Sequence, residues 1–229
     1  MKKLVVGCLF LMAFSAQAQG ISVLDRMDNT GASGSLFRNK VLDKPKEKIV
    51  GTPYLNEVFM SSTISGVENI FLTRYNAFSD EVEVSYDESI FVIPKEERYS
   101  TIYNKASDYK LQLLRYNAEK DEYVYGYLFE IFSNDKVGFY KREQITLQEA
   151  REAPNGYSLP VPPKYNRKNE EYYLKMDAER VVPFPKSKKA LLNLYASNEQ
   201  KVSSYLKEEK ISFKKEEDLL KLTKFLATL

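Results

Sequence analysis

A stretch of alternating residues occurs twice in this chain and limits what the chain can fold into. In the first copy, at 70–86, two alternating runs flank a short segment rich in Asn, Ser and Asp. A period of two is typical of a half-buried strand, and these polar side chains can hydrogen-bond a reversing backbone. The second copy, at 113–125, matches the first at Arg-Tyr-Asn-Ala and at Asp-Glu without a gap. The two copies therefore predict two related β-hairpins in one antiparallel sheet.

Further strands are predicted around these hairpins, because short alternating runs follow one another with polar turns between them. The expected strands are 70–75, 81–86, 90–93, 99–103, 109–116, 122–132, 137–142 and 145–148. The longest, 122–132, carries large apolar residues on both faces, which predicts a position in the middle of the sheet. Before them, Gly51–Phe59 offers apolar anchors that would fasten the N-terminal part to the core.

The chain changes character after residue 152. Several prolines at 153–163 predict a stiff connector, and the alternative is a docking segment for an aromatic groove. A short strand pair follows at 171–182, and then the period becomes helical. A capping box is expected at Ser197–Gln200. The last helix places acidic residues first and lysines later, which suits the helix dipole, and buries a stripe of leucines. The stripe comprises Leu219, Leu222, Leu226 and Leu229.

The predicted fold class is α+β, with an antiparallel β-meander built on the two related hairpins and covered by C-terminal helices. Five parts are expected along the chain. These are a signal peptide at 1–18, a flexible lead-in at 19–50, an antiparallel β domain at 51–152, a Pro-rich connector with a short hairpin at 153–185, and a helical segment at 186–229.

The N-terminus has the pattern of an export signal. Lys2 and Lys3 precede an apolar segment at 4–14, and the small-residue cleavage site Ala-Gln-Ala ends at 18. The apolar segment is too short for a permanent membrane span, so the mature chain is expected to begin at Gln19 without one. The alternative is a lipoprotein in which Cys8 is acylated instead. The first interpretation is preferred because most of the apolar segment follows Cys8.

The composition excludes several kinds of chemistry. The chain has 34 basic and 32 acidic residues, so removal of Lys2 and Lys3 with the signal leaves a formally neutral protein. Such a chain has no general attraction for nucleic acid or for an anionic membrane. It has no histidine, and its only cysteine is Cys8. Beyond the signal, therefore, the sequence predicts no disulfide, no metal site with His or Cys ligands and no histidine base.

Carboxylates and tyrosines are the remaining candidates for a site. The best carboxylate clusters are Asp80-Glu81-Glu83 and Asp121-Glu122, which occupy equivalent points of the two repeats. A glycan hydrolase needs two carboxylates that face each other across a bond and differ in pKa. The preferred interpretation is structural, with each Asp in a turn and each Glu paired with Arg74 or Arg115 of its own repeat. The 17 tyrosines could form a binding face, but packing of individual rings in strands is favoured.

Three further motifs stand out: Gly-Thr-Pro-Tyr-Leu-Asn-Glu at Gly51–Glu57, Arg-Tyr-Asn-Ala-Phe-Ser-Asp-Glu-Val-Glu-Val at Arg74–Val84, and the lysine-rich Lys186–Lys189. With these motifs, the chain resembles a group of small, uncharacterised exported proteins of Bacteroidota-type bacteria. The resemblance implies a location in the cell envelope. It implies no activity, so no catalytic residue follows from it.

These observations favour a non-catalytic exported protein, periplasmic, associated with the outer membrane or secreted. Its expected partner is another envelope protein, within an outer-membrane assembly or a secretion system. One alternative is a periplasmic carrier that holds an apolar ligand between sheet and helices. The other is the carboxylate-dependent glycan hydrolase. No catalytic, cofactor-binding or metal-binding residue is predicted, and neither is a nucleic-acid partner.

Overall fold

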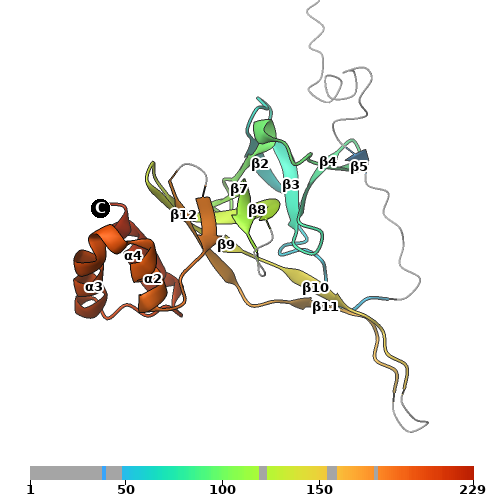
Figure 1. The fold of residues 1–229 in the computed structure, drawn as a ribbon. Coiled ribbons are helices and arrows are strands. Elements are labelled where there is room, and N and C mark those ends of the chain that lie inside the picture. The colour runs from blue at the N-terminus through green and yellow to red at the C-terminus, as the bar shows by residue number, and fades with distance from the viewer. Residues whose placement is uncertain (1–37, 40–47, 119–122, 154–158, 178–179) are drawn as a thin grey trace, which may run out of the picture.

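The computed structural model describes residues 38–39, 48–118, 123–153, 159–177 and 180–229. An 11-stranded sheet, a separate two-stranded sheet and a group of C-terminal helices make up the fold (Figure 1). Nearly all neighbouring strands are antiparallel, so the predicted α+β class with an antiparallel sheet is confirmed. The predicted signal peptide and Cys8 lie outside the described residues.

The predicted strands are present, with bounds that differ by a few residues at most. They are β3 (Phe71–Asn76), β4 (Glu81–Tyr86), β5 (Ser89–Val92), β6 (Thr101–Asn104), β7 (Tyr109–Asn117), β8 (Tyr123–Ser133), β9 (Val137–Arg142) and β10 (Ile145–Gln148). A short 3-10 helix, η1 (Glu97–Tyr99), precedes β6. The predicted pair at 171–182 forms β12 (Glu171–Met176) and β13 (Arg180–Pro183).

Three strands were not predicted: β1 (Arg38–Asn39), β2 (Met60–Ile64) and β11 (Lys164–Arg167). The alternation of β2 is hidden because one of its inward positions carries Ser62, which is buried. The hydroxyl of Ser62 lies 2.7 Å from that of Thr73 on β3 and accepts a hydrogen bond of 3.1 Å from the amide of Asn104 on β6. These bonds satisfy a buried polar group, so a strand forms without an apolar residue there.

Both repeated segments form antiparallel strand pairs in the same sheet, β3–β4 and β7–β8. Their registers differ, because Asn76 faces Glu81 in the first pair whereas Asn117 faces Tyr123 in the second. The second connecting loop is therefore longer by one residue. A shift of one residue in register exchanges the two faces of a strand. Equivalent residues of the two repeats therefore lie opposite different partners in the two strand pairs. That the two hairpins derive from one unit stays a prediction.

The predicted pairing of Arg74 with Glu81 is wrong. Arg74 lies directly opposite Glu83 in the register of β3 and β4, and its guanidinium bonds that carboxylate. The equivalent Arg115 lies opposite Tyr125, 5.7 Å from the ring centroid, and its predicted partner Glu122 lies outside the described residues.

Strands β2 to β8 curl around the first hydrophobic core. Its buried residues are Ile64, Tyr75, Ala77, Val82, Val84, Ile93, Tyr99, Ile102, Leu111, Leu113, Tyr127 and Ile145. The segment before β2 closes one side, because the amides of Ala77 and Phe78 both bond the Pro53 carbonyl. Burial of this many large side chains is the main source of stability for such a sheet.

Strands β7, β8, β9, β12 and β13 form a closed ring next to the curled part. The ring closes because β13 pairs in parallel with β7, through Val181 and Tyr116. Its interior is filled by Tyr116, Leu128, Tyr140, Tyr173 and Val181. Strands β7 and β8 belong to both parts and therefore contribute to both cores. This sharing explains why β8 carries large apolar residues on both faces, as its predicted position in mid-sheet requires.

The helices are α2 (Lys188–Leu194), η3 (Ala196–Asn198), α3 (Glu199–Glu208) and α4 (Glu216–Leu226). They pack against the outer side of the ring, where α4 contacts β8 and β9. The third core, between helices and ring, includes Phe139, Leu174, Leu191, Leu219 and Leu222. The helices thus cover the ring and lie away from the hairpin β3–β4 (Figure 1). Among the described residues, no helix has the length and apolarity that crossing a membrane requires.

The expected capping box at Ser197–Gln200 does not form. Ser197 lies within η3, and α3 begins after Asn198 without a side-chain hydrogen bond at its cap. The cap is found one helix earlier, where the hydroxyl of Ser187 accepts a bond of 3.3 Å from the Ala190 amide at the start of α2.

Strands β10 and β11 form a two-stranded ribbon that continues beyond its regular part through the pair Arg151 and Val161. We call residues 149–153 and 159–163 the arm. It projects away from the body of the molecule, on the side opposite the helices (Figure 1). The range 153–185, expected to be a Pro-rich connector with a short hairpin, contains β11, β12 and β13 in its described residues.

Candidate functional site

Asp80, one of the carboxylates considered for catalysis, holds the curled sheet together. It ends the β3–β4 turn with a φ of 54°, a left-handed conformation that Asp tolerates better than most residues. Its Oδ1 accepts bonds from the Tyr75 hydroxyl at 2.8 Å and from the Tyr127 amide at 3.1 Å. Its Oδ2 forms an ion pair with Lys95. Every oxygen of this carboxylate therefore has a structural partner.

The other carboxylates of that hypothesis do not oppose Asp80 in the described part of the chain. Glu81 accepts a hydrogen bond of 2.9 Å from Ser79 in the same turn. Asp121 and Glu122 lie outside the described residues. On the side of Asp80 that faces β8, a side chain at Gly126 would bring its Cβ within 2.5 Å of Asp80 Oδ2. Gly126 thus permits the close approach of the turn to β8.

Buried tyrosines lie near Asp80 and its contact with β8. Their raised pKa values predict that the protein loses stability at alkaline pH. Burial raises the pKa of Tyr116 to about 12, from an ordinary value of 10.0. Burial, and then the charge of Asp80, raises the pKa of Tyr75 well above that ordinary value. Because the folded state keeps its phenol protons to higher pH, we expect the free energy of unfolding to fall as pH rises from about 10 to 12, by up to about 1.4 kcal/mol per pH unit and group.

The variant Tyr116→Phe removes one of these titrating groups. Urea unfolding at about pH 9 and pH 12 should therefore show a fall that is about 2–3 kcal/mol smaller in the variant than in the original chain. An equal fall of the free energy of unfolding in both proteins would contradict the assignment of this pH dependence to Tyr116.

Arg74 and Glu83 form an ion pair on the face of β3 and β4 opposite to that of Tyr75. Glu83 is completely buried, and its Oε2 lies 2.7 Å from Arg74 Nη2. The hydroxyl of Tyr54 and the amide of Asn76 each donate to Glu83 Oε1 at 3.3 Å. The Arg74 guanidinium also lies 3.7 Å from the ring centroid of Tyr54 and 4.3 Å from that of Phe59. The cluster thereby anchors the segment 54–59 to the sheet.

A second cluster of charges joins helix α4, the ring and the base of the arm. Lys141 on β9 lies 3.4–3.6 Å from carboxylate oxygens of Glu143, Glu170 and Glu216. Burial lowers the pKa of Lys141, but the three carboxylates outweigh burial and raise it above its ordinary value. Glu143 is itself buried and binds Arg167 of β11 in a bidentate pair, with two contacts of 2.8 Å. These bonds fix the base of the arm relative to the ring.

The described residues 159–162 of the arm are exposed and apolar. The side chain of Leu159 is 87% exposed and that of Val161 is 41% exposed. Both belong to the sequence Leu-Pro-Val-Pro-Pro at 159–163, in which only Pro163 is buried. At the base, Val50 adds to the ribbon, because its amide bonds the Pro163 carbonyl at 2.9 Å and its carbonyl accepts from the Tyr165 amide at 2.9 Å. The base of the arm is thus held in place by hydrogen bonds, whereas residues 159–162 of the arm are apolar and exposed.

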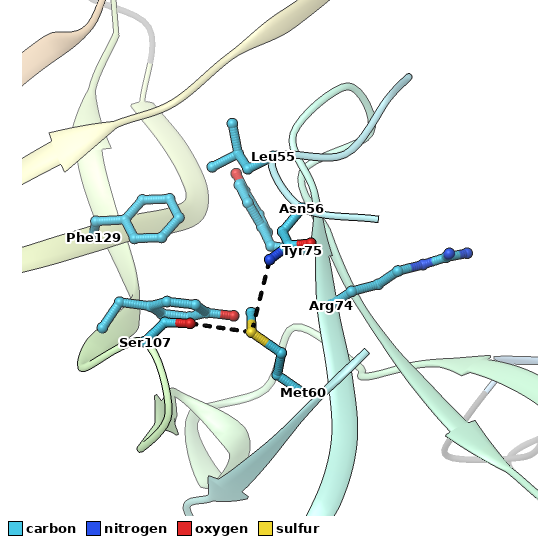
Figure 2. A pocket seen from close by; sticks show the side chains of 8 residues that line it. Leu55, Asn56, Met60, Arg74, Tyr75, Ser107 and Phe129 are labelled. Atoms are coloured by element: carbon cyan, nitrogen blue, oxygen red, sulfur yellow. Dashed lines mark hydrogen bonds between the residues drawn. The ribbon is translucent and has the colours of Figure 1, made fainter. Parts of the chain in front are cut away.

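A small pocket opens at one end of the curled sheet, with a volume of about 200 Å³ (Figure 2). It lies between the segment 54–59, strands β2, β3 and β8, and the turn between β6 and β7. The lining residues are Leu55, Asn56, Met60, Arg74, Tyr75, Ser107, Tyr109 and Phe129. The pocket is separate from the interface between sheet and helices, which is where a carrier was expected to hold its ligand.

Neither the arm nor the pocket was predicted from the sequence as a site. The exposed Leu-Pro-Val-Pro-Pro was recognised only as an alternative docking segment, and the pocket brings together residues from 55 to 129 that no local pattern connects. Within the described residues, no group of three or more His, Cys, Asp or Glu side chains is arranged to hold a metal ion. No protein-family model, curated protein or solved structure matches this chain.

Proposed function

We propose that this chain is a non-catalytic exported protein of the cell envelope that binds another envelope protein through the arm. The observation that carries the proposal is the exposed apolar sequence at 159–162 of the arm, with Leu159 at 87% exposure. A single exposed leucine is ordinary, but Leu159, Pro160, Val161 and Pro162 are all exposed and together form a contiguous apolar stretch that a partner can cover.

The chemistry of the arm indicates the kind of partner. Proline fixes φ, so the segment 159–163 loses little conformational entropy when it binds. Extended proline-containing segments of this kind dock in grooves lined by aromatic side chains. We therefore expect a partner with an aromatic groove that takes Leu159 and Val161.

The bonds at the base of the arm support a binding role. The pair of Arg167 with Glu143 and the added strand at Val50 hold the base in one orientation. A segment that is already oriented binds with a smaller loss of freedom than a flexible loop. The engaged state of Asp80 supports the non-catalytic part, because its oxygens are occupied by Tyr75, Tyr127 and Lys95.

The double variant Leu159→Ser/Val161→Ser tests this function. Both positions are exposed, so we expect its stability to change by less than about 0.5 kcal/mol. In size-exclusion chromatography of mildly solubilised envelopes, the original chain should elute in a larger complex and the double variant as the free chain. The molecular mass of the original chain recovered from the larger complex should be that of a chain beginning at Gln19.

A matched control is Glu208→Ser, at an exposed position of α3 on the opposite side of the molecule. It should elute with the original chain. The proposal fails if the double variant stays in the larger complex, or if the original chain elutes alone.

A further inference from the structure

We propose that the pocket at the end of the curled sheet binds one uncharged aromatic ring that carries a hydrogen-bond acceptor, as a phenol does. This second site uses other residues than the arm and does not depend on the function proposed for the arm. A phenol ring could reach it as a free small molecule or as the side chain of a tyrosine.

The volume of the pocket fits a ligand of this size. At about 200 Å³, it is somewhat larger than an apolar cavity of about 150 Å³, which is known to hold benzene. It is smaller than the range of about 300–1,000 Å³ that is usual for sites of larger ligands and cofactors. One six-membered ring with a small substituent is therefore the matching ligand.

The walls favour an aromatic ligand over an aliphatic one. The ring of Phe129 lies edge to face with Tyr75 and with Tyr109, each at a centroid distance of 5.5 Å. A further ring can join such a cluster in the same geometry. Met60 adds a thioether, which makes favourable contacts with aromatic rings. The orientation of Tyr75 is fixed by its hydrogen bond to Asp80, so this wall exists before a ligand arrives.

Two exposed residues at the pocket carry hydrogen-bond donors whose only acceptor there, among the described residues, is the sulfur of Met60. Asn56 Nδ2 lies 3.8 Å and Ser107 Oγ 3.1 Å from the sulfur of Met60 (Figure 2). A thioether is a weak acceptor, so a ligand oxygen at this place would improve both contacts. The charge of Arg74 is already balanced by Glu83. The pocket therefore favours a neutral oxygen, such as a phenol hydroxyl, over a carboxylate.

Methyl NMR of chain labelled with ¹³C at the methionine methyl groups tests the site directly. Met60 lies in the pocket wall, and Met176, buried beneath the helices, is an internal control. Titration with p-cresol should shift the Met60 signal in a saturable way and leave the Met176 signal in place. Toluene, which lacks the oxygen, should bind several-fold more weakly.

A comparison of one peptide with p-cresol distinguishes the source of the ring. If capped Ala-Tyr-Ala shifts the Met60 signal at least as strongly as p-cresol, the natural ligand is a tyrosine side chain. If only p-cresol does so, it is a free phenol. Equal binding of toluene and p-cresol would overturn the role of the acceptor. The whole proposal is overturned if no compound gives a saturable shift, or if Met176 shifts in parallel with Met60.

A variant that fills the pocket supplies a second test. Ser107 is exposed, so Ser107→Phe is compatible with the fold and would place its own ring in the pocket. It should abolish the response to p-cresol. Ser204→Phe adds the same ring at an exposed position of α3 and should leave the response unchanged. An unchanged Met176 signal in both variants shows that each is folded.

Discussion

Replacement of Arg74 by methionine is expected to lower the free energy of unfolding by about 3–5 kcal/mol. The reason is the environment of Glu83, which has no exposure to water and forms an ion pair of 2.7 Å with Arg74. Without Arg74, the buried carboxylate keeps the hydrogen bonds of Tyr54 and Asn76 but loses its ion pair with the guanidinium. Urea unfolding followed by far-UV circular dichroism measures the change.

Arg115→Met is the matched control for this prediction. Arg115 occupies the equivalent position of the second repeat, but it is exposed and lies 5.7 Å from the ring centroid of Tyr125. Its replacement should change stability by less than about 0.5 kcal/mol. Similar losses in the two variants would contradict the assignment of a special role to the Arg74–Glu83 pair. The double variant Arg74→Met/Glu83→Leu should recover part of the loss, because it removes both buried charges.

The second large effect is expected at the interface between helices and ring. Leu222 of α4 is completely buried in the core that also contains Phe139 and Leu174. Leu222→Ala removes apolar contacts and leaves a cavity, so we expect a loss of about 2–5 kcal/mol. Calorimetry of thermal unfolding gives this change in the free energy of unfolding at the midpoint temperature of the transition.

Lys221→Ala is the control at the neighbouring position, where the side chain is exposed. It should change stability by less than about 0.5 kcal/mol. If Leu222→Ala also leaves the transition unchanged, the helices do not stabilise the ring in the way that their packing indicates.

The sequence predicted most of this fold because its strands show a clear alternation. The period of two located β3, β4, β7 and β8 within a few residues, and the helical period located α4. Strand β2 was missed because Ser62 occupies an inward position, where its polarity is satisfied only by residues of two other strands. Such compensation depends on contacts that a local pattern does not contain.

The closed ring and the arm could not be predicted from local patterns either. Closure depends on a parallel contact between Val181 and Tyr116, far apart in the sequence. The prolines at 160–163 indicated a connector, because proline cannot donate a hydrogen bond within a sheet. The ribbon accommodates them beyond its regular part, where Arg151 and Val161 restore the pairing.

The candidate sites depend on register, which explains why the sequence identified their residues incompletely. The predicted partner of Arg74 was two positions away from the true one, on the same face of β4. Asp80 was recognised as a turn residue, but its bonds to Tyr127 and Lys95 require the curled shape of the sheet. The pocket requires in addition that the segment 54–59 lies against the end of that sheet.

Site-specific photo-cross-linking in living cells tests the proposed binding role of the arm most directly. A photoreactive amino acid at Leu159 should give one discrete adduct with another envelope protein, and the same amino acid at Glu208 on α3 should give none. Identical patterns at the two positions, or an adduct only between two copies of this chain, would contradict the proposal that the arm binds a different envelope protein.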